Sequence, residues 1–178
     1  MTLYSFKEFT PQIASNVFIA PSADIIGRVS IGEDASIWHQ TVVRGDIDFI
    51  QIGKNTNIQD RCLLHVTKDF PLIVGDQVSV GHSVTLHGCT VEDHSLIGMG
   101  AIIMDGAHIS HHSVVAGGSV VPPGKKYPPF SMIMGNPAVV KRPLTEKEIT
   151  MYGQHYTSYV GYKNEYLDGV SVKEIIEK

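Results

Sequence analysis

Residues 74–87, VGDQVSVGHSVTLH, carry an aliphatic side chain at every sixth position, at Val74, Val80 and Leu86. A glycine, Gly75 or Gly81, directly follows the first two of them. We interpret each six-residue unit as one short strand whose first and fifth side chains point inward, and we expect the glycine to allow the tight turn between units. This period predicts a solenoid.

The same period extends over most of the chain, interrupted by insertions after Val43 and Leu64 and by one five-residue unit. Three units would close one triangular coil, and coils stacked about 4.8 Å apart would bury a continuous aliphatic column. The sequence therefore predicts an all-β solenoid, a parallel β-helix of hexapeptide repeats over about residues 12–125. The units open at Ile19, Ile25, Ile31, Ile37, Val43, Ile52, Ile58, Leu64, Val74, Val80, Leu86, Val91, Ile97, Ile103, Ile109, Val115 and Val121.

A C-terminal α-helix is predicted after the repeats. The Pro-Pro-Gly segment at 122–124 is expected to end the repeat, and Thr145 followed by Glu148 is a capping-box pattern. We expect the helix over about residues 144–168, with Gly169 as its stop and its apolar face packed on the β-helix. That face comprises Ile149, Tyr152, Tyr156, Tyr159 or Val160, and Tyr166 to Leu167.

Composition and charge argue against several classes of partner. The 178 residues carry a formal net charge of -4 without a basic run, so we expect no nucleic acid partner. No apolar stretch approaches the roughly 18 residues of a membrane span, and the N-terminal residues lack a secretory pattern. We therefore expect one cytoplasmic domain of residues 1–178. Its two cysteines, Cys62 and Cys89, are expected to be reduced packing residues.

Two histidines are expected to stack on one face of the β-helix. The units that open at Val43, Leu64 and Leu86 lie three units apart in succession, so their second residues, Arg44, His65 and His87, form one outward column. His65 and His87 would then be one coil apart, about 4.8 Å between backbones. Two imidazoles at this spacing can converge on a cation such as Zn²⁺.

A third histidine, His82, is expected on the neighbouring face, one coil from Asp60 and close to Gln59. A corner separates it from His87, so the two cannot easily bind the same metal within one chain. A second chain that lays its own His82 face against the first chain's His65 face removes this difficulty, and a three-fold ring closes such a heterologous contact. The sequence therefore predicts a homotrimer with interfacial Zn²⁺, with Fe²⁺ or Co²⁺ as alternatives.

Five segments resemble the γ-class carbonic anhydrases and their bacterial relatives often labelled hexapeptide transferase-like. The resemblance covers essentially the whole chain and implies a left-handed β-helix, a homotrimer, and metal-dependent reversible hydration of CO2 to bicarbonate. The Gly135-Asn136-Pro137-Ala138 segment and the tyrosine-rich terminal helix belong to the same pattern. The five segments are Arg44-Gly45-Asp46, Asn57-Ile58-Gln59-Asp60, Leu64-His65, Gly81-His82 and Leu86-His87-Gly88.

The resemblance also implies roles for individual residues. It makes His65, His82 and His87 the metal ligands, as in a zinc site with an open coordination position. Gln59 would orient the attacking oxygen nucleophile toward CO2. Tyr156 would approach the site from the terminal helix.

The interface and the proton path carry further expectations. By the same resemblance, Arg44 pairs with Asp60 across the subunit interface, and Asp46 helps to hold it. Two glutamates assist proton transfer in the archetypal family member, and here Ile47 and residues 66–69, Val-Thr-Lys-Asp, stand at the matching places. Since hydration of CO2 exports a proton in each cycle, this departure predicts slow turnover or none, unless another group serves.

Two other functions fit parts of the same pattern. Hexapeptide-repeat acyltransferases share the architecture and the segment 135–138, but they typically use a lone histidine as base and need no metal. A catalytically weak metal-binding accessory trimer would explain the missing glutamates. The remaining histidines are interpreted as solvated coil positions without partners, and the His111-His112 pair is the one of them most suited to a stray metal; the six are His39, His94, His108, His111, His112 and His155.

Overall fold

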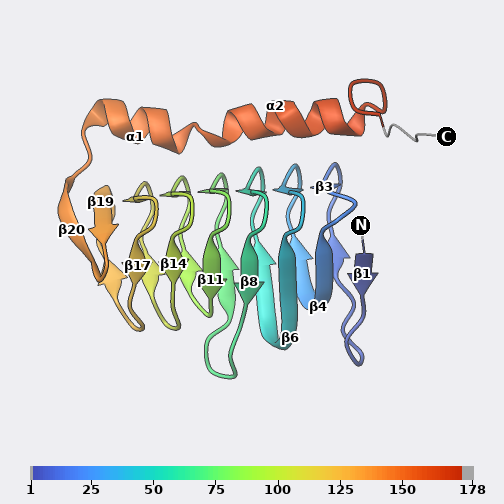
Figure 1. Cartoon of the computed structure of the whole chain (residues 1–178), viewed down its shortest axis with the longest axis horizontal. Helices are drawn as coiled ribbons and strands as arrows, with labels where there is room; N and C mark the ends of the chain where they lie inside the picture. The colour runs from blue at the N-terminus through green and yellow to red at the C-terminus, as the bar shows by residue number, and fades with distance from the viewer. Residues whose placement is uncertain (1, 174–178) are drawn as a thin grey trace.

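Each coil of the structure consists of short parallel strands, and successive coils pair strand on strand. The computed structural model describes residues 2–173. Figure 1 shows the strands stacked one beside the next along the long axis of the molecule, with the helices running along one side. The chain forms a left-handed parallel β-helix of about 7 turns, which confirms the fold class predicted from the six-residue period and the family resemblance.

The strands form three faces. The histidine face contains β1 (Thr2–Tyr4), the first parts of β4 (Asp24–Ile31) and β6 (Val42–Ile52), β8 (Leu63–His65), β11 (Thr85–His87), β14 (Ile102–Ile103) and β17 (Val120–Val121). The helix face contains β3 (Phe18–Ile19), β5 (Ser36–Ile37), β7 (Asn57–Ile58), β10 (Ser79–Val80), β13 (Leu96–Ile97), β16 (Val114–Val115) and β19 (Ser131–Gly135). The third face contains β2 (Gln12–Ile13), the second parts of β4 and β6, β9 (Leu72–Val74), β12 (Thr90–Val91), β15 (His108–Ile109) and β18 (Lys126–Tyr127).

The residues that open the units form the core. Val43, Leu64 and Leu86 are completely buried, as is the small fifth-position residue Ala101. Burial of aliphatic surface at every sixth residue is the main stabilising contribution to such a coil, because each coil contacts only its two neighbours.

The glycines that follow the aliphatic residues do not make the turns, and the reason predicted for them was wrong. The turns have positive φ two residues later, for example at Asn55 (54°) and Gln77 (58°). Gly53 has no positive φ, but a Cβ added to it would lie 2.4 Å from the backbone of Gly75 on the next coil. The close approach of neighbouring coils therefore requires these glycines.

The two insertions have different structures, and the repeat ends later than expected. The first insertion belongs to the continuous strand β6, which pairs with β4, whereas the second forms a loop with a bridge between Thr67 and Phe70. The coils continue past residue 125, because β18 pairs with β15 and β19 with β16. Tyr127 and Ile133 supply the buried side chains of this last coil.

The predicted C-terminal helical segment consists of two helices. An antiparallel strand, β20 (Ala138–Pro143), pairs with β19 and leads into α1 (Glu146–Gly153) and α2 (Tyr156–Leu167). The capping box of Thr145 and Glu148 is present, and Gly169 follows the end of α2 with φ of 68°. Neither helix in the described part of the chain has the length and apolar character of a membrane span.

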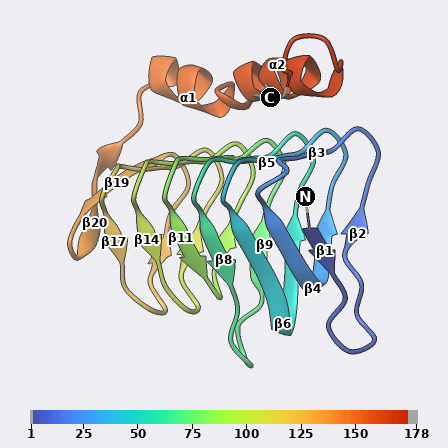
Figure 2. The same cartoon turned by 45° about the vertical axis from the view of Figure 1, so that its right-hand side comes forward.

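The helices run back along the β-helix from its last coil toward its first, as Figures 1 and 2 both show. Tyr159 and Tyr166 of α2 pack edge-on against Trp38, with ring centroids 5.5 and 5.1 Å apart. Lys163 of α2 is completely buried and its ammonium lies 2.8 Å from the Asp34 carboxylate. These contacts attach α2 to the helix face and position the residues at the junction of the two helices.

Candidate metal centre

His65 and His87 lie side by side on the histidine face. Strand β8 pairs with β11 so that His65 is opposite His87, and β6 places Arg44 opposite His65, which confirms the predicted column. Nδ1 of His65 lies 3.1 Å from Nε2 of His87. Two nitrogens bound to one tetrahedral Zn²⁺ at about 2.0–2.1 Å are about 3.3 Å apart, so this pair fits such a cation.

Each of the three candidate ligands has a carboxylate partner on one ring nitrogen. His65 Nε2 is 3.0 Å from Asp46 Oδ1, His82 Nδ1 is 2.8 Å from Asp60 Oδ2, and His87 Nδ1 contacts Asp105. A carboxylate at one nitrogen orients the ring and raises the basicity of the other nitrogen, which is the usual environment of a metal-binding histidine. The donor chemistry therefore fits a divalent metal. The contact of Asp105 with His87 was not predicted, because Asp105 stands at a different position of its unit from His87.

Asp46 connects the histidine column to Arg44. Its carboxylate is 2.5 Å from Arg44 Nη1 and 3.0 Å from His65 Nε2. Partial burial opposes the ionisation of Asp46, but the hydrogen bonds from Arg44 and His65 outweigh it and lower the pKa of this carboxyl. Asp46 therefore carries a negative charge next to His65 at neutral pH. Within one chain Arg44 pairs with Asp46, and Asp60 pairs with His82.

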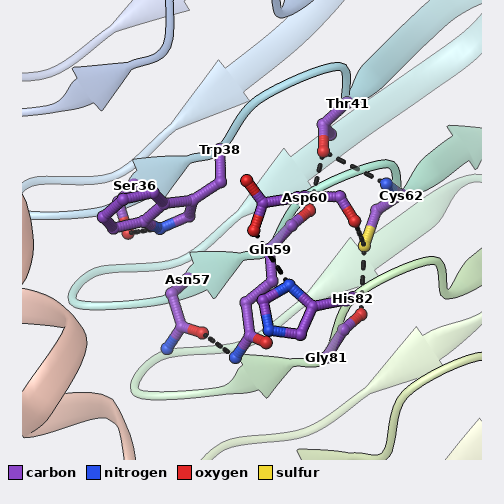
Figure 3. Close-up of polar contacts among 9 residues, drawn as sticks. All are labelled: Ser36, Trp38, Thr41, Asn57, Gln59, Asp60, Cys62, Gly81 and His82. Atoms are coloured by element: carbon purple, nitrogen blue, oxygen red, sulfur yellow. Dashed lines mark hydrogen bonds and ion pairs between the residues drawn. The ribbon is translucent and has the colours of Figure 1, made fainter.

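Gln59, Asp60 and His82 form the second part of the candidate site, on the helix face. Asn57 and Ile58 of β7 pair with Ser79 and Val80 of β10, which brings Asp60 and His82 together one coil apart, as predicted. Figure 3 shows the Gln59 side chain near the His82 ring, with its amide directed at Asn57. Gln59 Nε2 donates to Asn57 Oδ1 at 3.1 Å, and both side chains are buried.

A cavity of about 260 Å³ lies between this face and the junction of α1 and α2. Gln59, His82, His155 and Tyr159 contribute to its lining. Burial, followed by the negative charge of Asp60, raises the pKa of Tyr159 to about 12, so its hydroxyl stays protonated at neutral pH. The predicted residue Tyr156 is the first residue of α2, is partly buried, and is not among the lining residues. Tyr159 was predicted only as a packing residue and His155 only as a solvated position, so their place in this cavity was not predicted.

The two parts of the site do not combine within one chain. Over residues 2–173, no group of three or more His, Cys, Asp and Glu side chains is arranged to hold a metal. His82 and His87 remain partly exposed on neighbouring faces, with side-chain exposures of 40% and 34%. A single chain therefore presents a pair of histidines on one face and a lone histidine on the next.

The six other histidines were predicted to be solvated coil positions without partners. His155 is exposed and the other five are partly buried, but all six have side-chain partners, which corrects the second part of the prediction. His108 Nε2 is 2.8 Å from Glu92 Oε1, and the rings of His94 and His112 stack with centroids 4.5 Å apart. Burial, followed by the charges of His94 and His111, lowers the pKa of His112. His39 contacts Ser22, and His155 contacts Ser79. The ring of His111 packs against Phe130, with centroids 5.0 Å apart, and also contacts its sequence neighbour His112. Apart from the contact between His111 and His112, these partners come from another coil, which a count along the repeat does not reveal.

Both cysteines are free and buried, as predicted. The Cys62 thiol donates to the Gly81 carbonyl at 3.1 Å, and burial raises its pKa to about 12. Burial raises the pKa of Cys89 as well. A thiol that stays protonated is a poor metal ligand, so neither cysteine is a candidate ligand of this site.

The repeated unit, the three ladders and the column of histidines define a hexapeptide-repeat β-helix protein. In agreement, residues 10–45 match the family described as bacterial transferase hexapeptide, six repeats. The carbonic anhydrase of Geobacillus kaustophilus is 52% identical over 147 residues, which cover 83% of this chain and 81% of that protein. The chain belongs to the γ-class carbonic anhydrase family.

Two further comparisons add to this. Gamma carbonic anhydrase 2, a mitochondrial protein of Arabidopsis thaliana, is 43% identical over 89% of this chain, and the chain spans 59% of that protein's length. A solved Bacillus cereus structure, described as a candidate acetyltransferase, is 44% identical, covers 94% of this chain and 97% of its own, and superposes with a TM-score of 0.92. The fold is thus common to relatives that carry two different functional descriptions.

Proposed function

We propose that this protein catalyses the reversible hydration of CO2 to bicarbonate at metal centres between the subunits of a homotrimer. The observation that carries the proposal is the facing pair of His65 and His87, with nitrogens 3.1 Å apart and a carboxylate behind each ring. The names of relatives that are more than 40% identical over most of the chain support the same activity.

In this proposal one chain supplies His65 and His87, and the next supplies His82. Two ligands on one face and one on the other make each contact heterologous, and three such contacts close a ring. Exposed apolar side chains support a contact at both faces: Leu63 and Ile102 lie on the histidine face at 44% and 36% exposure, and Met99 lies beside the His82 cavity at 63%. Large apolar side chains grouped around a site are typical of protein interfaces.

The chain's own residues bind and orient the reactants. A divalent cation, Zn²⁺ or alternatively Fe²⁺ or Co²⁺, supplies an acidified water when bound. The Gln59 amide donates one hydrogen bond to Asn57, so its carbonyl oxygen is left to accept one from the nucleophile in the cavity. Arg44 and Asp46 form one side of the interface, where Arg44 would pair with the neighbouring chain's Asp60.

The path by which protons leave the site differs from that of the archetypal family member, because the two expected glutamates are missing. Ile47, at a position where the resemblance expects a glutamate, is 54% exposed and cannot accept a proton. Tyr156 stays a prediction, and Tyr159 is the tyrosine whose position in the cavity favours contact with the reactants. Since each turnover releases one proton, we expect turnover to depend strongly on buffer concentration, because buffer can replace the missing acceptor.

An acyltransferase is the second candidate, because the similar Bacillus cereus structure is described as a candidate acetyltransferase. Isothermal titration with acetyl-CoA tests it: acyl transfer requires binding, whereas a carbonic anhydrase needs none. A metal-binding trimer without CO2 hydration would instead indicate an accessory role.

The experiment is CO2 hydration by stopped flow on protein purified without oxygen and loaded in turn with zinc, iron and cobalt. We expect metal-dependent hydration, one metal per chain, and a solution mass three times the 19.5 kDa of the chain. His82→Ala should lose both metal and activity. His108→Ala is the matched control, because His108 is also a partly exposed histidine bound to a carboxylate but lies on the third face. A fully metallated trimer that is inactive with every metal contradicts the proposal.

A further inference from the structure

A chain of hydrogen bonds connects the junction of the two helices to Gln59. Gln59 Nε2 donates to Asn57 Oδ1 at 3.1 Å, and Asn57 Nδ2 donates to Ser79 Oγ at 2.9 Å. The Ser79 hydroxyl oxygen lies 3.1 Å from Nδ1 of His155. This hydrogen-bond chain thus joins residues of two neighbouring coils to His155, which lies 76 positions after Ser79 in the sequence.

The three inner members of this hydrogen-bond chain are shielded from water. Asn57, Gln59 and Ser79 are 1%, 4% and 2% exposed, and all three belong to the helix face beneath the junction. A buried polar group without a hydrogen-bond partner is destabilising, so the orientation of each side chain constrains that of the next. Water cannot easily replace a missing partner at these positions.

The hydrogen bonds of this network are all donated in the same direction when Ser79 donates to His155. A serine hydroxyl has one proton, and the Ser79 oxygen already accepts from Asn57. When His155 Nδ1 accepts the Ser79 proton, every donor from Gln59 onward is directed toward the helices, and the carbonyl oxygen of Gln59 is directed away from Asn57. Burial lowers the pKa of His155, which favours the neutral ring that this arrangement needs.

An alternative arrangement exists if the acceptor on His155 is lost. Ser79 can then donate to the Asn57 carbonyl, the Asn57 amide turns over, and the Gln59 amide turns over with it. The nitrogen of Gln59 would then be directed into the cavity that it shares with His82. An amide nitrogen cannot accept a hydrogen bond, so this arrangement would remove the contact proposed for Gln59.

We propose that His155 is a positioning residue that selects, through Ser79 and Asn57, the orientation of the Gln59 side-chain amide. His155 can reach Ser79 because it lies in the break between α1 and α2. Gln154 caps the C-terminus of α1 with φ of -100°, and His155 precedes α2 and contacts Ser79 of β10. The inference uses the proposed function only for the partner of Gln59; the amide orientation itself is a property of the metal-free chain.

The primary test is nuclear magnetic resonance of the side-chain amides in metal-free, ¹⁵N-labelled protein. The Asn57 and Gln59 amide signals are assigned by their loss in Asn57→Asp and Gln59→Glu. In His155→Leu, which removes the acceptor, both signals should shift or split and their hydrogen exchange should accelerate. In His155→Asn, whose side-chain oxygen can occupy the place of Nδ1, the original signals should return.

Two further variants separate positioning from a general loss of structure. Ser79→Ala interrupts the hydrogen-bond chain without changing any residue of the helix junction, and it should change the Gln59 signal as His155→Leu does. Gln154→Ala changes an exposed neighbour at the same junction and should leave both signals in place. Unchanged Asn57 and Gln59 signals in both His155→Leu and Ser79→Ala overturn the inference.

Activity gives a second readout. If the metal-loaded trimer hydrates CO2, His155→Leu should lower kcat about tenfold with unchanged metal content, and His155→Asn should restore most of it. The double variant with Ser79→Ala should lose no more than either single variant, because both interrupt one chain. An inactive wild-type protein defeats the proposed function but not the inference, which the amide signals decide.

Discussion

Asp105 hydrogen-bonds Nδ1 of His87 from the next coil, on the opposite side of the ring from the nitrogen that faces His65. The carboxylate therefore orients the His87 ring toward His65, and it stabilises the tautomer whose free nitrogen can bind a metal. This contact lies within one chain, so a single chain already orients the His65 and His87 part of the candidate site.

Asp105→Asn should weaken metal binding about tenfold, because a neutral amide accepts a weaker hydrogen bond than a carboxylate and orients the ring less firmly. Competition with a chromophoric chelator measures the affinity. Glu92→Gln is the control, since Glu92 makes the same type of contact with His108 outside the candidate site. Equal metal affinity in Asp105→Asn and the wild type contradicts the assignment of His87 as a ligand.

The buried ion pair of Lys163 and Asp34 predicts an asymmetric effect of mutation. Lys163 is completely buried, whereas the Asp34 side chain is 31% exposed. Asp34→Asn leaves a buried cation without its counter-charge and should destabilise the protein by about 3 kcal/mol, whereas Lys163→Met leaves a carboxylate that water can reach and should cost about 1 kcal/mol. Urea unfolding at one fixed protein concentration measures both. Equal costs, or a larger cost for Lys163→Met, would show that the ion pair is not what attaches α2.

Stability should fall as the pH falls below about 6.5, and His112 should contribute to this. Its pKa is lowered in the folded chain by burial and by the nearby His94 and His111, with Asp93 opposing. The unfolded chain, with a histidine pKa of about 6.5, therefore binds the proton more readily. Its contribution is complete above pH 6.5 and is lost as the pH falls from there toward the lowered pKa of the folded state.

The melting temperature at pH 7.5 and pH 5.5 measures this dependence. His112→Asn, which tolerates the positive φ of 52° at this position, should reduce the difference between the two temperatures. His39→Asn is the control, because His39 lies outside this cluster and contacts Ser22. If His112→Asn shows the same difference in melting temperature between pH 7.5 and pH 5.5 as the wild type, protonation of His112 does not destabilise the fold and the prediction is wrong.

Two glycines should respond to alanine in opposite directions. A Cβ on Gly53 would lie 2.4 Å from the Gly75 backbone, so Gly53→Ala must separate two coils and should cost about 1–3 kcal/mol. Gly161 lies in α2 with nothing within 4 Å of an added Cβ, so Gly161→Ala should stabilise by about 0.5–1 kcal/mol. Thermal unfolding of both variants tests the assignment, and a neutral Gly53→Ala would contradict the close approach of the coils.

Much of the candidate site could be predicted because its residues belong to the repeat. The register of Arg44, His65 and His87 follows from counting units, and so does the proximity of Asp60 to His82. The count does not extend to side chains at irregular places. Asp105 reaches His87 from a different position of its unit, and the role predicted for Gly53 in a turn was wrong because backbone proximity between coils leaves no periodic signal.

The sequence by itself determined the coil, its three faces and the columns of residues along them, because a six-residue period with an inward aliphatic residue has one regular way to bury its apolar side chains. Only the tertiary structure decided that the C-terminal segment breaks at Gln154 and His155, and that His155 and Tyr159 enter the cavity beside His82. The path of a helix over a finished surface depends on contacts such as those of Trp38 and Asp34, which are distant in sequence from α2. No local pattern encodes such contacts, because their free energy arises only once the coils have formed the surface on which the helix packs.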